Sequence, residues 1–335
     1  MKVVVLGAGA SHHVGYPLTK DLCPKLLDWA ERNEPANQLY WPDRDGLSGF
    51  ASLDDIEELV SQVEKAQKPG PILEGLRNTF CAYFDSIRAN DAPLYRQLAE
   101  DVVKAGDVVI TFNYDVSLDR ELRRAGIWEV RDGYGFEIHT IDPPRSGVKL
   151  LKLHGSTNWI DSLFNGLRGG QTMVGGGDSH GVRPVLLPQE FEFLEYSGIK
   201  DLQFNGGGVS RAGSMVLPST NKRFHIRTSG SPREREDFWS HLWNQAADAL
   251  RTAHEIVVIG YSLPLADERA RSLLLDAENS GTPVTVCCGG DNERLRCEFR
   301  QAGFKDVRTD LECFDNWLDA VSGRSAGLAV GTAAC

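Results

Sequence analysis

The chain has 335 residues, of which 41% are hydrophobic and 25% are charged, a balance that suits one large domain with an elaboration, or two domains. Its formal net charge of −11 disfavours unspecific binding to nucleic-acid phosphates or anionic lipid. No apolar run approaches the roughly 20 residues of a membrane span, and the start lacks a signal peptide's basic flank and cleavage site. We therefore expect a cytoplasmic protein that acts on a small molecule, without direct nucleic-acid or membrane binding.

Apolar, β-rich runs alternate with helical patterns along the chain, which is typical of a parallel sheet covered on both faces. The strands expected from these runs are residues 2–6, 107–111, 149–153, 183–187, 256–259 and 284–287. We therefore predict an α/β fold with a Rossmann-like, doubly wound, mostly parallel sheet.

Two helical patterns lie between the first two expected strands. Residues 53–66 and 72–87 carry apolar side chains at helical spacing. Roughly a hundred residues are too many for a simple crossover, so we expect a helical subdomain, about residues 40–100, inserted after the first strand. Further helices are predicted over residues 234–253 and 267–279.

Two glycine-rich segments, 165–181 and 205–214, are predicted to be irregular, mobile loops. The small residues of 321–335 are predicted to form a disordered tail, which leaves one domain over residues 1–320. The seven cysteines contain no C-x-x-C pair, so we interpret them as thiols, without a disulfide framework or zinc ribbon. Adjacent His12 and His13 lack partners at ligand spacing, and no bound metal is expected.

The first expected strand runs directly into Gly-Ala-Gly-Ala-Ser, residues 7–11. Free backbone amides beyond a strand's carboxyl end suit a phosphate, because glycine lets the ligand approach and a helix start favours an anion. A plain tight turn, with Ser11 as a helix cap, is the alternative. The dinucleotide fingerprint fails at His12, and Asp28 falls inside a helical pattern rather than at a strand end, which disfavours an ordinary dehydrogenase.

Polar peptides follow three more of the expected strands: TFNYD at 111–115, KLHGS at 152–156 and GYSLPLAD at 260–267. Because the carboxyl ends of strands in a doubly wound sheet converge on one crevice, these peptides together predict a site.

Together with GAGAS and GYP within residues 7–17, and LPSTNK at 217–222, these peptides resemble the sirtuin superfamily. The resemblance is greater to its bacterial sirtuin-like branch, much of which consists of NAD-consuming antiphage defence proteins, and it covers roughly residues 1–310. The chain lacks the paired cysteines of the deacylase zinc module, and it has Phe112 where deacylases have glutamine. The resemblance therefore implies the NAD-cleaving part of sirtuin chemistry rather than deacylation.

The resemblance assigns Asn113 and Asp115 to a nicotinamide pocket and His154 to general-base catalysis. An amide can hydrogen-bond a ribose or fix a water, and an imidazole can accept a proton near neutral pH. The alternatives are structural: Asn113 or Asp115 would cap a helix starting at residue 116, and His154 would be a turn histidine.

Further contacts to NAD are expected where strands end in glycine, serine or aspartate. Gly260 and Ser262 match the segment that holds the adenosine side in sirtuins, and Asp291 suits a ribose diol. Asp267 is either a helix cap or a functional residue. The full set of expected NAD contacts is Gly7, Ala8, Gly9, Ser11, Gly155, Ser156, Gly260, Ser262 and Asp291.

The resulting hypothesis is an NAD hydrolase, which cleaves its substrate NAD to nicotinamide and ADP-ribose with water as the nucleophile and no metal. The resemblance implies an effector of bacterial antiphage defence. An unrestrained NADase is toxic, so we expect restraint by a homo-oligomer, a ligand or a regulatory sensor protein. The alternatives are a non-catalytic NAD or ADP-ribose sensor and, as a third, a protein deacylase or ADP-ribosyltransferase.

Overall fold

A computed structural model describes six longer segments of the chain and several short pieces between them. The segments are residues 1–33, 55–65, 91–129, 147–158, 232–309 and 313–323. The pieces are residues 73, 76, 79–80, 82–84, 86–87, 132, 134–135, 203–204, 207–208, 216–218 and 311. Side chains are described from residue 239 onward in the helix that begins at 232.

A six-stranded sheet with the order β3-β2-β1-β6-β7-β8 forms the centre of the molecule, and all of its strand pairs are parallel. The strands are β1 (Lys2–Leu6), β2 (Val108–Thr111), β3 (Lys149–Lys152), β6 (Glu255–Ile259), β7 (Val284–Cys287) and β8 (Val307–Arg308). Valine, isoleucine and leucine dominate β1, β2 and β6, which are buried because helices cover both faces of the sheet. The fold is therefore α/β and doubly wound.

The direction of winding reverses between β1 and β6. From β1 the chain continues to β2 and β3 on one side, whereas β6, β7 and β8 occupy the other side. Val3 pairs with Val108 in β2 and with Ile256 in β6. A strand-order reversal of this kind opens a crevice at the carboxyl ends of the strands, where ligands bind in such folds.

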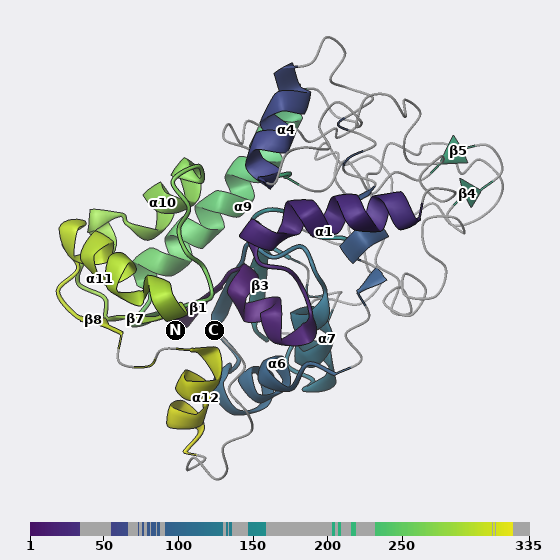
Figure 1. Cartoon of the computed structure of the whole chain (residues 1–335). Helices are drawn as coiled ribbons and strands as arrows, with labels where there is room; N and C mark the ends of the chain where they lie inside the picture. The colour runs from purple at the N-terminus through teal and green to yellow at the C-terminus, as the bar shows by residue number, and fades with distance from the viewer. Residues whose placement is uncertain are drawn as a thin grey trace.

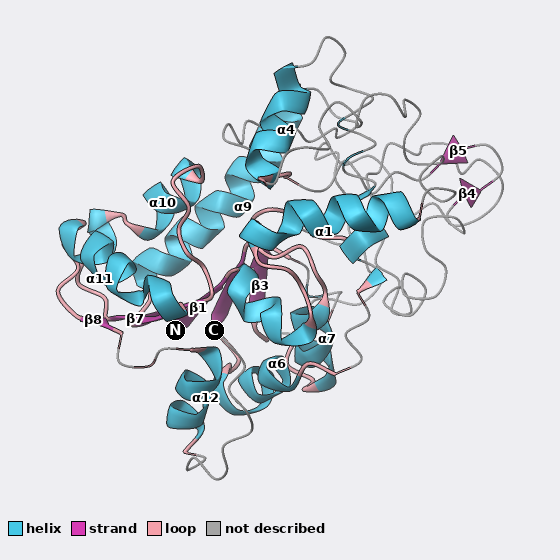
Figure 2. Ribbon diagram, in the orientation of Figure 1, coloured by secondary structure: helices cyan, strands magenta, loops and turns pink. Residues whose placement is uncertain are grey.

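Helices cover both faces of the sheet (Figures 1 and 2). They are α1 (Thr19–Arg32), α4 (Ile56–Lys65), α6 (Pro93–Gln97), α7 (Ser117–Arg124), α9 (Pro232–Thr252), α10 (Glu268–Leu274), α11 (Asn292–Gln301) and α12 (Phe314–Ser322). Short 3₁₀ helices are Ala8–Val14, Ala277–Asn279 and Gly289–Asp291, and a π-helical turn spans Leu98–Val102. In Figure 1, α9 and α10 lie on one side of the sheet and α6 and α12 on the other.

The helices between β1 and β2 form a second core beside the core of the sheet. Its buried side chains come from α1, α4 and residues 73–84, joined by Tyr114 and Leu217. The apolar stripe predicted in α4 is buried throughout, with Ile56 and Val63 at its two ends. This second core confirms a helical subdomain inserted after the first strand.

The structure corrects several details of the sequence interpretation. β8 was not predicted, because two residues are too short to show a period, and the helix expected to reach residue 279 ends at Leu274. Glycine-rich residues 205–214 were expected to be irregular, but β5 (Gly207–Gly208) pairs with β4 (Gln203–Phe204). The expected strand 183–187 and loop 165–181 lie outside the described residues.

The interpretation of every cysteine as a thiol is also wrong at one position. Cys23, Cys287, Cys288 and Cys297 are free, whereas Cys313 is disulfide-bonded. The tail beyond residue 323 is not among the described residues.

Candidate functional site

The turn after β1 packs directly against the turn after β6. A Cβ atom added to Gly9 would lie 2.8 Å from Gly260 Cα, and one added to Gly7 would lie 2.6 Å from the Gly260 carbonyl oxygen. Gly260 has a φ of 60°, and a Cβ there would lie 2.2 Å from the Ala10 nitrogen. The glycines are therefore required for two backbones to touch at the strand-order reversal. A larger side chain at Gly9 would therefore disrupt this packing, whether or not the turn contacts a phosphate.

Three amides of the same turn are used within the protein. The Gly7 amide donates to the Ile259 carbonyl at 3.0 Å, the Gly9 amide to Gly260 at 2.9 Å, and the Ala10 amide to Gly7 at 2.9 Å. The expectation that these three amides are free for a phosphate is therefore wrong, because the carbonyls of Ile259, Gly260 and Gly7 accept their hydrogen bonds.

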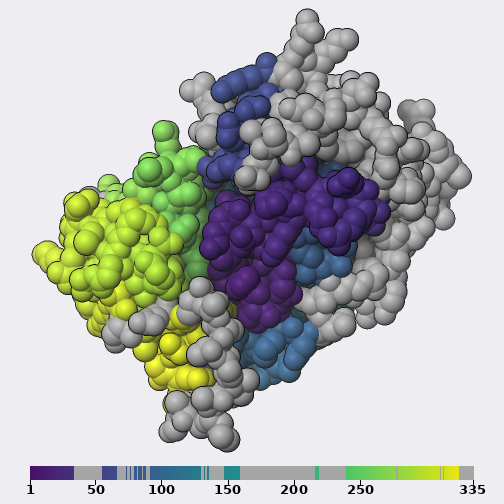
Figure 3. Space-filling model, viewed as in Figure 1, coloured from purple at the N-terminus to yellow at the C-terminus, as the bar shows by residue number. Residues whose placement is uncertain are grey.

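An open pocket lies beside this turn, lined by Ala8, Ser11, Tyr16, Pro17, Thr19, Leu22, Glu57, Phe84, Phe112, Asn113, Tyr114, Asp115, His154, Pro218, Gly260, Tyr261, Ser262, Pro264 and Asp267. It includes all three predicted catalytic residues and four of the predicted NAD contacts. In Figure 3, the N-terminal segment that supplies one wall meets the green and yellow C-terminal half of the molecule.

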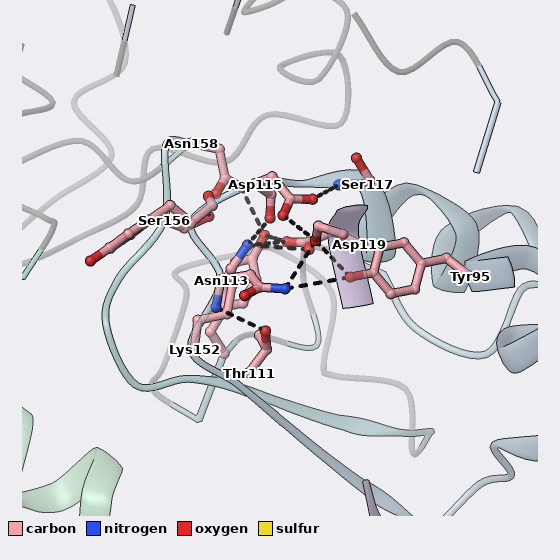
Figure 4. Close-up of polar contacts among 12 residues, drawn as sticks. Tyr95, Thr111, Asn113, Asp115, Ser117, Asp119, Lys152, Ser156 and Asn158 are labelled. Atoms are coloured by element: carbon pink, nitrogen blue, oxygen red, sulfur yellow. Dashed lines mark hydrogen bonds and ion pairs between the residues drawn. The ribbon is translucent and has the colours of Figure 1, made fainter. Parts of the chain in front are cut away.

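Ser11 is the centre of a buried polar cluster on the β1 and β2 side of the pocket (Figure 4 shows the neighbouring Tyr95, Asn113 and Asp115). Its hydroxyl donates to Asp115 Oδ2 at 2.6 Å, lies 2.7 Å from the Tyr95 hydroxyl, and accepts from Asn113 Nδ2 at 2.9 Å. Burial raises the pKa of Tyr95 well above its ordinary value, so the Tyr95 hydroxyl is protonated and donates to Ser11. Ser11 therefore donates its single hydroxyl proton to Asp115 and accepts hydrogen bonds from Tyr95 and Asn113.

This cluster shows which of the capping roles considered from the sequence are formed. Ser11 lies inside the 3₁₀ helix Ala8–Val14, which has Gly7 at its N-cap position and no side-chain capping bond, so Ser11 is not its cap. Asp115 Oδ1 accepts the Ser117 amide at 3.0 Å, so Asp115 caps α7 with one oxygen and binds Ser11 with the other. Asn113 Nδ2 also donates to the Gly7 carbonyl at 2.8 Å, which ties the two strand ends together.

A buried ion pair lies beneath Asp115 (Figure 4). Lys152 Nζ donates to the Asp115 carbonyl at 2.6 Å and lies 3.3 Å from both carboxylate oxygens of Asp119. Asp119 also accepts from the Tyr134 hydroxyl at 2.8 Å, and Asn158 Nδ2 donates to that hydroxyl. Burial raises the pKa of Asp119, and the charge of Lys152 opposes this effect.

His154 faces a second buried carboxylate across the pocket. Its Nε2 lies 3.1 Å from Asp267 Oδ2, which also accepts the Tyr261 hydroxyl at 2.7 Å. Asp267 Oδ1 accepts the Ala270 amide at 3.3 Å and so caps α10, as the sequence allowed. A helix cap contributes only about 1 kcal/mol, whereas burial of an unpaired carboxylate costs several kcal/mol. The cap alone does not account for the burial of Asp267.

Aromatic side chains surround His154. Phe112 meets the imidazole edge-on with ring centroids 5.0 Å apart, and Phe112 stacks on Tyr261 at 4.1 Å. Trp243 lies 6.4 Å from the imidazole. Burial raises the pKa of Tyr261, and the negative charge of Asp267 raises it further, so Tyr261 keeps its proton and donates it to Asp267.

Five of the predicted NAD contacts lie outside the lining of the pocket: Gly7, Gly9, Gly155, Ser156 and Asp291. Ser156 is fully buried and donates to the Tyr114 carbonyl at 3.3 Å. Asp291 pairs with Arg294, whose guanidinium also contacts the carbonyl of the pocket residue Ser262. The roles of these five residues toward NAD remain predictions.

The sequence interpretation missed Tyr95, Tyr114 and Tyr261 as parts of the site. Tyr114 and Tyr261 lie inside two of the quoted peptides, so their place next to a strand end was a usable signal. Tyr95 lies in α6, far from any motif, and no sequence signal marks it.

Among the described residues, no group of three or more histidines, cysteines, aspartates or glutamates is arranged to hold a metal ion. No helix in the described part of the chain is long and apolar enough to span a membrane.

The fold and the pocket define an α/β protein with a doubly wound parallel sheet and a largely apolar pocket that contains buried carboxylates and a histidine. No protein-family profile and no curated protein sequence matches the chain. Solved structures of Sir2 proteins are similar to it. Sir2Tm bound to a propionylated peptide shares 15% identity at a TM-score of 0.37, over 96% of this chain and 92% of that one.

A second similar structure, from work on the mechanism and regulation of Sir2 enzymes, shares 16% identity at a TM-score of 0.42, over 96% of this chain and 91% of that one. A third, Sir2 with the inhibitor EX-527, 2'-O-acetyl-ADP-ribose and a deacetylated p53 peptide, shares 14% identity at a TM-score of 0.40. It covers 96% of this chain and 93% of that one.

Proposed function

We propose that the protein hydrolyses NAD to nicotinamide and ADP-ribose. One observation carries the proposal: Asn113, Asp115 and His154, which the sirtuin resemblance assigns to NAD cleavage, line a single pocket. They follow two different strands, β2 and β3, so their meeting is not a consequence of local sequence.

The charge of the pocket suits the cationic end of NAD. Cleavage of the bond between nicotinamide and ribose releases a neutral leaving group and leaves a ribosyl cation, so it requires a held ribose and nearby negative charge. Glu57, Asp115 and Asp267 line the pocket, and its described lining contains no lysine or arginine.

The hydrogen bonds of Asn113 orient its side chain toward a substrate hydroxyl. Its Nδ2 donates to the Gly7 carbonyl and to Ser11 Oγ, so the amide oxygen is the atom that can accept from a ribose hydroxyl or a water. In this proposal His154 is the base that removes a proton from the attacking water.

The test is nicotinamide release from NAD by the purified protein, followed by chromatography. Asn113→Ala and His154→Ala should each lower the rate by roughly 100-fold or more. The matched controls Asn316→Ala and His241→Ala change exposed residues outside the pocket and should keep the wild-type rate. Near-normal turnover in folded Asn113→Ala or His154→Ala would contradict the proposed site.

Calorimetric titration of NAD into the same preparations separates the alternatives. Tight NAD binding without nicotinamide release, with and without candidate activators, would favour the sensor. Stoichiometric zinc in the purified protein would favour a deacylase.

The finer biological role follows the branch that the sequence resembles. We propose a cytoplasmic effector that depletes NAD during phage infection and is restrained by self-association or by a partner protein. A specific rate that falls as protein concentration rises would support restraint by self-association. An NAD pool that stays constant in infected cells carrying the protein would contradict the defence role.

A further inference from the structure

We propose that Asp267 is the positioning residue of this site: its carboxylate pairs with Nε2 of His154 and fixes the imidazole that takes the proton. This inference rests on the proposed function insofar as His154 acts as the base. The contact between the two side chains does not depend on that function.

The carboxylate of Asp267 is fixed at both oxygens. Oδ2 lies 3.1 Å from His154 Nε2 and 2.7 Å from the Tyr261 hydroxyl, while Oδ1 accepts the Ala270 amide at 3.3 Å. Rotation of the carboxylate would break the helix cap or the contact to the ring. The start of α10 therefore sets the direction from which the imidazole is held.

The ring of His154 is enclosed by rings on other elements. Phe112, after β2, meets it edge-on at 5.0 Å, Tyr114 stacks with it at 6.3 Å, and Trp243 of α9 lies 6.4 Å away. The His154 carbonyl accepts the Val216 amide at 2.9 Å, which fixes the backbone. These contacts restrict the plane of the ring, and Asp267 distinguishes its two nitrogens.

The charged groups around the ring identify Asp267 as its partner. Glu57 and Asp115 line the same pocket, and Asp115 Oδ2 and Oδ1 accept the Ser11 hydroxyl and the Ser117 amide. The guanidinium of Arg269 lies over the Trp243 ring at 4.5 Å.

Tyr114 and Tyr261 also lie near the ring. Burial raises the pKa of both hydroxyls, and Asp267 contributes to the shift, so both are neutral. Among the described residues, Asp267 is the carboxylate within ion-pair distance of the His154 ring.

In the proposed step, water attacks the nicotinamide ribose of NAD. The water oxygen bonds to C1′ of the ribose, its proton passes to the imidazole of His154, and the bond from C1′ to the pyridinium nitrogen breaks. The electron pair of that bond neutralises the nicotinamide, and the imidazolium later releases its proton to solvent. Asp267 stays ionised and stabilises the imidazolium, because opposite charges attract strongly in a buried site.

Asp267→Asn tests the inference, because asparagine keeps an acceptor for the Ala270 amide and removes the charge. The matched control is Asp276→Asn, at an exposed aspartate whose Oδ1 accepts the Glu278 amide at 3.0 Å. Histidine labelled with ¹⁵N reports the tautomer and titration of His154, with His154→Ala for assignment.

In Asp267→Asn the midpoint of the His154 titration should fall by about 1 pH unit, and in Asp276→Asn it should not move. The rate constant kcat for nicotinamide release should fall by roughly 10-fold or more with KM little changed, and its pH profile should shift with the titration. An unchanged titration and tautomer in folded Asp267→Asn would overturn the inference. A shifted titration in a protein that never cleaves NAD would support the pairing and refute the proposed hydrolysis.

If Asp267→Asn does not fold, Tyr261→Phe replaces it. That variant removes the hydroxyl that shares Oδ2 with His154, so the carboxylate should bind the imidazolium more strongly and the midpoint should rise. A midpoint that stays at the wild-type value would overturn the inference.

Discussion

The peptide KLHGS, residues 152–156, supplies the basic residue of two buried acid–base pairs, and the surroundings of these two pairs differ. Lys152 and Asp119 lie beneath the pocket with side chains 0% and 1% exposed, whereas His154 and Asp267 lie in its wall with side chains 8% and 1% exposed. Lys152 directs its ammonium to the Asp115 carbonyl and to both oxygens of Asp119.

The comparison separates a pair enclosed by the protein from a pair that lines the pocket. A lysine ammonium has three donors, and the contacts of Lys152 occupy them inside the protein, so this pair has no group to offer a ligand. His154 lines the pocket and has a second ring nitrogen. Burial of charge is therefore common to both pairs, and access to a ligand is what differs.

The largest expected effect comes from breaking the pair beneath the pocket. Lys152→Met leaves Asp119 buried without its cation and should lower the free energy of unfolding by about 3–5 kcal/mol, measured by urea denaturation. The double variant Lys152→Met/Asp119→Asn removes both charges and should be less destabilised than the single variant. A loss below about 1 kcal/mol in the single variant would show that the pair is not structural.

A smaller effect is expected from Asp115, a buried carboxylate whose contacts are hydrogen bonds rather than a salt bridge. Ser11→Ala removes the donor to Asp115 Oδ2 and the partner of the Tyr95 hydroxyl. It should cost about 1–3 kcal/mol of unfolding free energy, because buried polar groups lose their partners. If urea denaturation of Ser11→Ala gave the wild-type unfolding free energy while its NAD affinity fell in calorimetry, Ser11 would be a ligand contact rather than the centre of a structural cluster.

The smallest effect is expected from an ion pair that is exposed to solvent and lies outside the pocket. Arg251 and Asp248 lie one helical turn apart on α9, 2.6 Å from each other and with side chains 55% and 63% exposed. Asp248→Asn should change the unfolding free energy by less than about 1 kcal/mol, because solvent screens the pair. A larger change in urea denaturation would mean that exposure does not separate these pairs.

Much of the sheet could be predicted because its signals are local. The apolar runs of β1, β2, β3, β6 and β7 appear in the sequence, and their ends differ from the predicted ends by at most one residue. The capping role of Asp267 was also predictable, since its acceptor bond reaches only three residues along the chain.

The polar contacts of the site could not be predicted from the sequence. Ser11 bonds to Tyr95 and Asp115 across 84 and 104 residues, and no spacing in the sequence reports those partners. Nothing in the sequence indicates that the amides of Gly7 and Gly9 are hydrogen-bonded, because their acceptors are the carbonyls of Ile259 and Gly260, about 250 residues away.

By itself the sequence determined which peptides end the strands and that those ends share one edge of the sheet, because side-chain period and parallel crossovers are properties of nearby residues. Only the tertiary structure decided what each polar group faces. The order β3-β2-β1-β6 places Gly260 against Gly9 and brings Asp267 to His154. Hydrogen bonds act over about 3 Å, so partners far apart in the chain are set by the packing of the strands.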